Sequence, residues 1–271
     1  MYPITAQYLQ FLRLRRCTPQ TIYGRSRFLA RLEADCGLAP IDIDAATLTA
    51  WYSRRALTLT PRSQNTELTC ARAFYRWAVN QGHRPDDPTL LLARPLTVPG
   101  RPRPMPTADV LACVASSTGR IHAGIVCAAY AGMRAIEIAH AEPSWLSPER
   151  DTLTIVGKGG RSRVVPAHPL VVSAWLTAGE RIFPRYAYRR VGIASPGLVS
   201  QAMNKWLHET MGLSDSLHSL RHWYGTQLYR SSRDLRMVQD LMGHSSPQTT
   251  AGYADYSRRS ASTAVRDLPA A

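Results

Sequence analysis

The residues best suited to chemistry lie close together near the end of the chain. His218 and Arg221 stand three positions apart in a segment with a helical pattern, so their side chains share one face and can converge on one anion. Gly243 is predicted to end the next helix, which places His244 directly after that end. Tyr253 follows in the string TTAGY. An arginine, two histidines and a tyrosine could bind a phosphate ester and attack it, so we predict chemistry on phosphate.

A second group of charged residues lies between positions 134 and 158. Arg134 and Glu137 stand three apart in GMRAIEIAH, where the glutamate can orient the guanidinium, with a surface ion pair as the alternative. The buried helix predicted just before them favours a partly buried arginine. Lys158 lies in the turn GKGG, and only two of the 33 basic residues are lysines. Near phosphate a lysine can act as an acid, which an arginine cannot, although most lysines at turns are solvated charges.

The composition favours a nucleic-acid partner. The formal net charge is +14 and the isoelectric point is near 10.1, which suits a polyanion, with an anionic membrane surface as the second choice. The five cysteines are odd in number and form no C-x-x-C pair, so neither a disulfide framework nor a zinc site is expected. We see no signal peptide and no apolar run that could span a bilayer, so we predict a cytoplasmic, nucleoid-associated protein without membrane contact.

The residue pattern predicts a mainly α-helical protein of two domains with a small antiparallel β-hairpin. Residues 1–95 form a helical domain, with helices expected at 4–14, 19–35, 45–55 and 61–81. Residues 96–106 contain four prolines, one glycine and two arginines and form a stiff, basic linker. Residues 107–271 form the second domain, whose hairpin is expected at 152–156 and 162–165 around a turn at 157–160.

Further helices of the second domain are expected at 107–117, 121–130, 170–175 and 198–211, and residues 181–193 are expected to be irregular. Thr107 is predicted as an N-cap. Ser232 is predicted to cap the helix that Gly243 ends, with Asp234 in its first turn. Ser246 and Pro247 are predicted to open a short third helix that carries Tyr253.

Arginines in three places are candidates for DNA contact. Two lie on the helix at 61–81, away from its apolar stripe of Leu68, Ala71, Phe74, Tyr75 and Ala78, which we assign to the core. A solvated face is the alternative for those two. Two more lie in the linker, and two follow the turn of the hairpin. The six candidates are Arg72, Arg76, Arg101, Arg103, Arg161 and Arg163.

These motifs together resemble those of the tyrosine recombinase (phage integrase) family. The strings HSLRH, GH and TTAGY are similar to its H-x-x-R, G-H and terminal tyrosine boxes, in the same order and at about the same spacing. GMRAIE is similar to its first arginine box, and GKGGRSRVVP to the hairpin whose lysine enters the active site. The resemblance implies a SAM-like core-binding domain at 1–95 and a catalytic domain with a C-terminal tail at 107–271, in a short form without an arm-site binding domain.

The activity implied by the resemblance is site-specific DNA recombination or integration. A homotetramer on double-stranded DNA sites would cut and rejoin strands through a 3′-phosphotyrosine and a Holliday junction, without metal, cofactor or ATP. A directionality factor is a further candidate partner. The implied catalytic residues are Arg134, Lys158, His218, Arg221, His244 and Tyr253, with Glu137 as an orienting residue and Tyr256 as a competitor for the nucleophile.

Two other functions share many of these features. A type IB topoisomerase-like enzyme would nick and close DNA by the same chemistry as a monomer. A DNA-binding relative without catalysis would be expected to lack one or more of the motifs, and every motif is present here.

Overall fold

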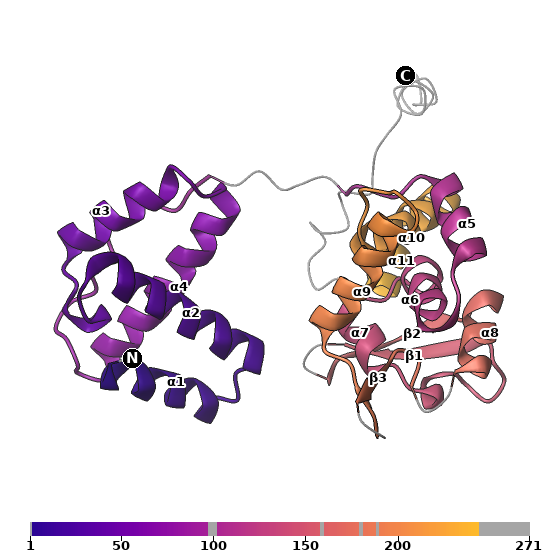
Figure 1. Cartoon of the computed structure of the whole chain (residues 1–271), viewed down its shortest axis with the longest axis horizontal. Coiled ribbons are helices and arrows are strands. Elements are labelled where there is room, and N and C mark those ends of the chain that lie inside the picture. Colours follow the sequence, from indigo (N-terminus) through magenta and orange to yellow (C-terminus); the bar gives the residue numbers. More distant parts are fainter. Residues whose placement is uncertain (1, 97–101, 158–159, 179–180, 188–189, 244–271) are drawn as a thin grey trace, which may run out of the picture. The chain divides into compact units, whose positions relative to one another are not determined.

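The computed structural model describes residues 2–96, 102–157, 160–178, 181–187 and 190–243. The chain divides into two compact units at residues 99 and 100 (Figure 1). Both are built mainly from helices, and the second also contains two short antiparallel hairpins, which confirms the predicted fold class. No helix in the described part of the chain combines the length and the apolar character needed to cross a bilayer.

The first unit consists of four helices and one 3-10 turn. Each predicted helix is confirmed to within two residues. Thr18 and Thr60 cap helices that begin with proline, because each hydroxyl oxygen accepts a hydrogen bond from a backbone N–H in the first turn. The elements are α1 (Pro3–Leu14), α2 (Pro19–Cys36), η1 (Pro40–Asp42), α3 (Ala45–Ala56) and α4 (Pro61–Asn80).

Aromatic side chains and one buried carboxylate hold the first unit together. The predicted apolar stripe of α4 lies in the core, where Phe74 contacts the rings of Tyr8 and Trp77. Glu67 of α4 is only 7% exposed and accepts hydrogen bonds from Arg31 of α2 and Arg55 of α3. A charged group at this depth is stable because two guanidinium groups compensate it.

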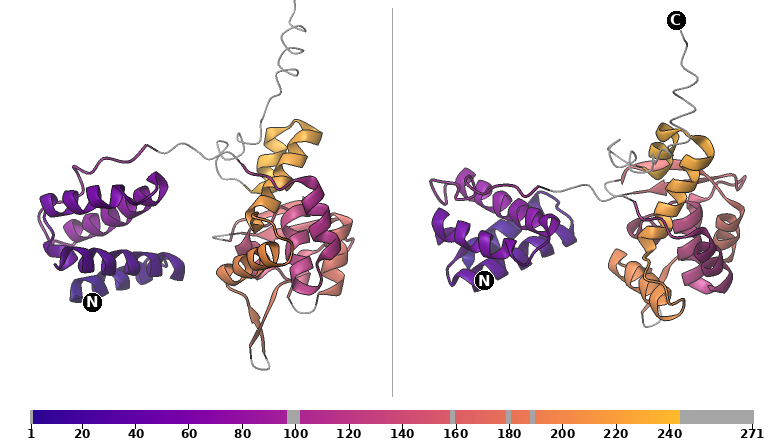
Figure 2. Two further views of the ribbon diagram at one scale, coloured as in Figure 1. Left: turned by 45° about the horizontal axis from the view of Figure 1, so that its top comes forward. Right: turned by 90° about the horizontal axis from the view of Figure 1, so that it is seen from above.

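A central helix, α6 (Gly119–Tyr130), organises the second unit (Figures 1 and 2). Its residues from Ala123 to Ala129 are all buried, and other helices pack around it. These are α5 (Thr107–Ser116), α8 (Pro169–Thr177), α9 (Pro196–Glu209) and α10 (Leu217–Ser232). The short α7 (Ala135–His140) packs on α9, the 3-10 turn η2 (Pro143–Trp145) packs on β1, and α11 (Leu235–Met242) packs on α10 and β2.

Two hairpins complete the second unit. Strands β1 (Thr152–Val156) and β2 (Ser162–Pro166) pair in antiparallel register, which confirms the predicted hairpin. Strands β3 (Pro184–Ala187) and β4 (Arg190–Ile193) form a second antiparallel pair, so the prediction of irregular structure at 181–193 was wrong. Basic residues do not prevent strand pairing, because the backbone supplies the ladder and tyrosine and valine favour it.

Two predicted N-caps were also wrong. Pro106 occupies the cap position of α5, and the hydroxyl oxygen of Thr107 instead accepts hydrogen bonds from Trp223 and Gln227 of α10. At the start of α11 the cap is Asp234, whose carboxylate accepts two backbone N–H bonds. Ser232 ends α10, and its hydroxyl donates back to the Leu228 carbonyl oxygen within that helix.

Candidate active site

Glu137 lies at the centre of the candidate site. Its side chain is 1% exposed, and its Oε2 accepts a hydrogen bond of 2.8 Å from the backbone N–H of Arg134. Its Oε1 accepts a second bond of 2.9 Å from Nη1 of the same arginine. The glutamate therefore binds both the backbone and the guanidinium of Arg134. Arg134 precedes α7 as its N-cap, however, and does not lie on a helical face with Glu137.

Arg163, from strand β2, contacts both oxygens of the same carboxylate. Its Nη1 and Nη2 each lie 2.9 Å from one oxygen of Glu137, and its Nε donates to the carbonyl oxygen of Leu241 at 2.9 Å. The side chain is 11% exposed. We expected Arg163 at a DNA contact, but its guanidinium points into the protein.

Arg221 lies in the first turns of α10 and is buried, with 1% of the residue exposed. Its Nη1 donates to the carbonyl oxygen of Gly132, and its Nη2 donates to that of Met242 at 2.6 Å. Its Nη1 also lies 4.0 Å from Oε2 of Glu137. One carboxylate thus binds guanidinium groups from the residue before α7, from β2 and from α10, which are far apart in sequence.

The three arginines also bind the end of α11 at consecutive residues. Arg163 donates to the carbonyl oxygen of Leu241, Arg221 to that of Met242, and Arg134 to that of Gly243 at 3.1 Å. The last carbonyl groups of a helix have no partner within it and carry partial negative charge, so cations are favourable there. The arginines therefore fix the end of α11, after which His244 follows in the sequence.

The surrounding charges keep Glu137 ionised. Burial alone would raise the pKa of this carboxyl group. The hydrogen bonds and charge of Arg163, the backbone N–H of Arg134 and the charge of Arg221 outweigh burial and hold the pKa below its ordinary value. The site consequently contains one buried negative charge among several positive charges. Its net positive charge is suited to an incoming anion.

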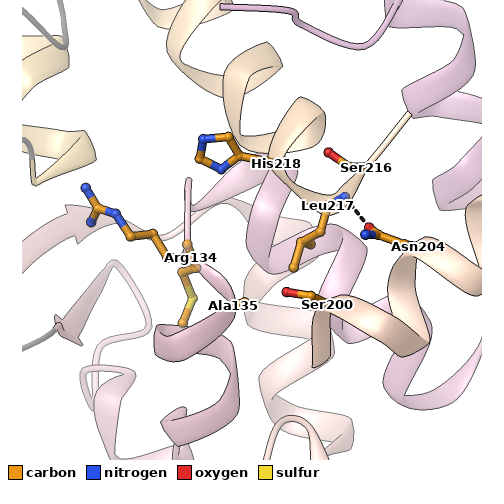
Figure 3. A pocket seen from close by; sticks show the side chains of 8 residues that line it. Arg134, Ala135, Ser200, Asn204, Ser216, Leu217 and His218 are labelled. Carbon is orange, nitrogen blue, oxygen red and sulfur yellow. Dashed lines mark hydrogen bonds between the residues drawn. The ribbon is translucent and has the colours of Figure 1, made fainter. Parts of the chain in front are cut away.

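His218 and Arg134 line a hollow of about 120 Å³ beside this cluster. Figure 3 shows these two side chains at one end of the hollow and Ser200 and Asn204 of α9 at the other. His218 is exposed, and its ring meets that of His222 edge-on at 4.4 Å between centroids. Burial, followed by the charges of His218 and Arg221, lowers the pKa of His222 to about 4.

Asn204 is a structural residue that the sequence did not reveal. Its Oδ1 accepts a hydrogen bond of 2.9 Å from the backbone N–H of Leu217, the first residue of α10 (Figure 3). This bond satisfies a free N–H at the start of the helix that carries His218 and Arg221. No local pattern could indicate it, because the partners lie on different helices.

The other predicted residues lie in several environments. Arg76, Arg103 and Arg161 are exposed, whereas Arg72 is partly buried and donates to the Leu92 carbonyl oxygen at 2.8 Å. Five predicted residues lie outside the described residues: Arg101, Lys158, His244, Tyr253 and Tyr256, as does the third helix expected from Ser246 and Pro247. In the described part of the chain, no group of three His, Cys, Asp or Glu side chains is placed to hold a metal ion.

Comparison with known proteins decides the family. Residues 110–259 match the phage integrase family. The chain is 31% identical over 282 residues to the tyrosine recombinase XerC of Methylobacterium sp. (strain 4-46), covering 92% of this chain and 87% of that one. The chain belongs to the phage integrase family of tyrosine recombinases. The XerC recombinase of Methylobacterium nodulans is 33% identical, with 88% of this chain and 83% of that protein covered.

Solved structures share the fold of this recombinase. A lambda integrase(75-356) dimer bound to a COC′ core site matches with a TM-score of 0.73, 19% identity and 96% of both chains covered. The Tn1549 transposon integrase bound to transposon right end DNA matches with a TM-score of 0.72 and 16% identity, covering 98% of this chain and 99% of that one. The predicted function, a tyrosine site-specific recombinase, is therefore confirmed at the level of the enzyme class.

Proposed function

We propose that this recombinase cuts and rejoins double-stranded DNA through a 3′-phosphotyrosine intermediate, using side chains alone and neither metal nor ATP. The observation that supports the proposal best is the convergence of Arg134 and Arg221 on the buried Glu137 carboxylate, beside His218. Arg134, which is partly exposed and held by this internal anion, is preorganised, so it need not rearrange when charge develops on a phosphate.

The two arginines would stabilise the non-bridging oxygens of the scissile phosphate as negative charge grows on them. Arg134, with 36% of its side chain exposed, can reach a phosphate directly. The side chain of Arg221 is 2% exposed, so its direct contact with DNA would require a local rearrangement of the chain. Loss of one such donor typically costs roughly 3 to 4 kcal/mol in the transition state, or about 10²- to 10³-fold in rate.

Tyr253 would be the nucleophile. Its phenolic oxygen forms the bond to phosphorus while the bond from phosphorus to the 5′ oxygen breaks, so the ester energy is kept in the phosphotyrosine. His218 takes the phenolic proton, and Lys158 gives a proton to the departing 5′ oxygen. His244 adds a hydrogen bond to a phosphate oxygen. In rejoining, the 5′ hydroxyl of the partner strand attacks the phosphotyrosine and releases the tyrosine.

The proposed partners are two double-stranded DNA recombination sites and three further copies of the chain. A lambda integrase tetramer bound to a Holliday junction has a TM-score of 0.69 to this chain at 18% identity. The net charge of +14 and the exposed Arg76, Arg103 and Arg161 suit contacts with the DNA backbone. A directionality factor is a further proposed partner. With DNA as substrate, the enzyme would act at the nucleoid in the bacterial cytoplasm.

A nicked suicide substrate tests the covalent step. If a nick lies close to the cleavage point, the short 5′ fragment diffuses away after cleavage and the covalent complex accumulates. We expect a protein–DNA adduct with the wild type and none with Tyr253→Phe. An adduct that persists in Tyr253→Phe would move the nucleophile to Tyr256 or elsewhere. Recombination between two sites on one plasmid then separates this function from simple nicking and closing.

A further inference from the structure

Three arginines contact Glu137, and the proposed chemistry gives a role to Arg134 and Arg221 but none to Arg163. We propose that it is a positioning residue for strand cleavage, whose guanidinium fixes Glu137, and through it Arg134, against the end of α11. The inference rests on the proposed function, because cleavage is the step that the positioning serves.

All three nitrogen atoms of the planar guanidinium fork of Arg163 take part in this contact. Nη1 and Nη2 face the two oxygens of Glu137, while Nε, on another edge of the guanidinium, faces the Leu241 carbonyl oxygen, all at 2.9 Å. One rigid group therefore sets the distance between α7, β2 and α11. A lysine offers one compact ammonium group in place of this fork, so it cannot satisfy the carboxylate and the carbonyl group with the same geometry.

The backbone packs tightly against the same pair of residues. A Cβ atom built on Gly243 would lie 3.1 Å from both Cδ and Nη1 of Arg163. A Cβ atom built on Gly157 would lie 3.3 Å from Oε1 of Glu137. These two glycines directly precede His244 and Lys158 in the sequence. The Arg163–Glu137 pair thus lies where the chain leads into two further proposed catalytic residues.

Arg163 differs from an arginine that binds DNA. Its side chain is 11% exposed, against 36% for Arg134, and each of its three nitrogen atoms has a partner inside the protein. A phosphate contact would require it to give up a bond to the buried Glu137. Its effect on cleavage therefore passes through the groups that it holds.

Loss of this positioning should slow cleavage far more than it weakens DNA binding. Displacement of reacting groups by about 1 Å can cost about 10²-fold in rate, which is the size of effect we expect for Arg163→Met. Arg163→Lys should recover only part of the rate, because it restores the charge beside Glu137 without the fork. If Arg163→Met does not fold, the cleavage rate of Arg163→Lys still tests the inference.

The experiment measures single-turnover cleavage of the nicked suicide substrate at saturating protein, for the wild type, both Arg163 variants and a control. The control is Arg236→Met, which removes one positive charge from an exposed position of α11, where Arg236 pairs with Asp240 on the surface. The dissociation constant for the same DNA is measured over a series of salt concentrations. Circular dichroism and urea denaturation give the folded fraction of each variant, and rates are expressed per folded protein.

We expect a cleavage rate lowered about 10²-fold in Arg163→Met, with an unchanged salt slope and a dissociation constant within about threefold of the wild type. A wild-type rate for Arg163→Met, or full recovery in Arg163→Lys, would overturn the inference. So would a salt slope reduced by about 0.9, which indicates a lost phosphate contact. A rate loss explained by the unfolded fraction would reduce Arg163 to a structural role. If the wild type itself forms no adduct, the proposed function fails instead.

Discussion

The substitution Glu137→Gln tests how the buried charges stabilise the second unit. The wild-type carboxylate accepts four hydrogen bonds from Arg134 and Arg163 and lies 4.0 Å from Nη1 of Arg221. Glutamine keeps the shape but has one acceptor oxygen, and its NH₂ group faces an arginine N–H. Arg163 and Arg221, both largely buried, would lose their ion pairs with the Glu137 carboxylate.

Removing one partner of a buried ion pair typically costs about 3 to 5 kcal/mol, because the remaining charge has neither water nor counterion. With a urea m-value of about 2 kcal/mol/M, the unfolding midpoint of the second unit should fall by about 1.5 to 2.5 M. The first unit does not contain Glu137, so its stability should not change. Peptide-resolved hydrogen exchange at increasing urea concentration reads the two units separately.

Glu209→Gln is the matched control. Glu209 undergoes the same chemical change in the same unit, but it is 65% exposed and lies 3.7 Å from Lys205 in a surface pair. Such pairs contribute about 0 to 1 kcal/mol, so the midpoint should shift by less than about 0.5 M. If Glu137→Gln lowers the midpoint no more than this control, the reasoning about a compensated buried charge is wrong.

Three further predictions concern the second unit and its binding to DNA. Gly132→Ala should destabilise the second unit by about 3 kcal/mol, because Gly132 has φ +59° and a Cβ atom there would lie 2.4 Å from the Tyr224 ring. The control Gly212→Ala, at φ +67° with nothing near the added Cβ atom, should cost only about 1 kcal/mol. Urea denaturation measures both. Below pH 6.5 the unfolded chain protonates His222 more readily than the folded protein does, since the folded pKa is about 4. The contribution of neutral His222 to stability is therefore complete above pH 6.5 and is lost as the pH falls towards 4. In His222→Asn, the free energy of unfolding measured with urea should depend less steeply on pH between 4 and 6.5. The same pH dependence as in the wild type would contradict this. DNA affinity should fall steeply with salt, with a log–log slope of about −0.9 per phosphate contact, and a flat dependence would exclude docking dominated by phosphate.

The sequence predicted the elements whose signals are local. Thr18 and Thr60, each followed by proline, fix helix starts by themselves, and Gly243 ends α11 with φ +61°, as expected. The first hairpin was equally clear, because β-branched residues flank a glycine-rich turn. Local hydrogen bonds and steric limits decide these features, so a short window of sequence contains the information.

Features that depend on distant partners could not be predicted. Arg163 is one arginine among many, and only the folded structure shows it on Glu137 and Leu241. Asn204 caps a helix other than its own.

The N-cap of α11 depended on a local choice between two neighbouring polar residues, Ser232 and Asp234. The ionised carboxylate of Asp234 accepts two backbone N–H bonds, while the hydroxyl of Ser232 donates back into α10.

The most direct test of the proposed chemistry is to identify the residue and the DNA end joined in the trapped complex. Digestion of the wild-type adduct followed by peptide mass spectrometry should find a nucleotide on the peptide that contains Tyr253, linked through the 3′ phosphate of the cleaved strand. An Arg134→Ala reaction stopped at the same early time, while the wild-type adduct is still forming, should contain that peptide in an amount lower by about 10²- to 10³-fold. An adduct on any other residue, or a link through the 5′ end, would contradict the proposal.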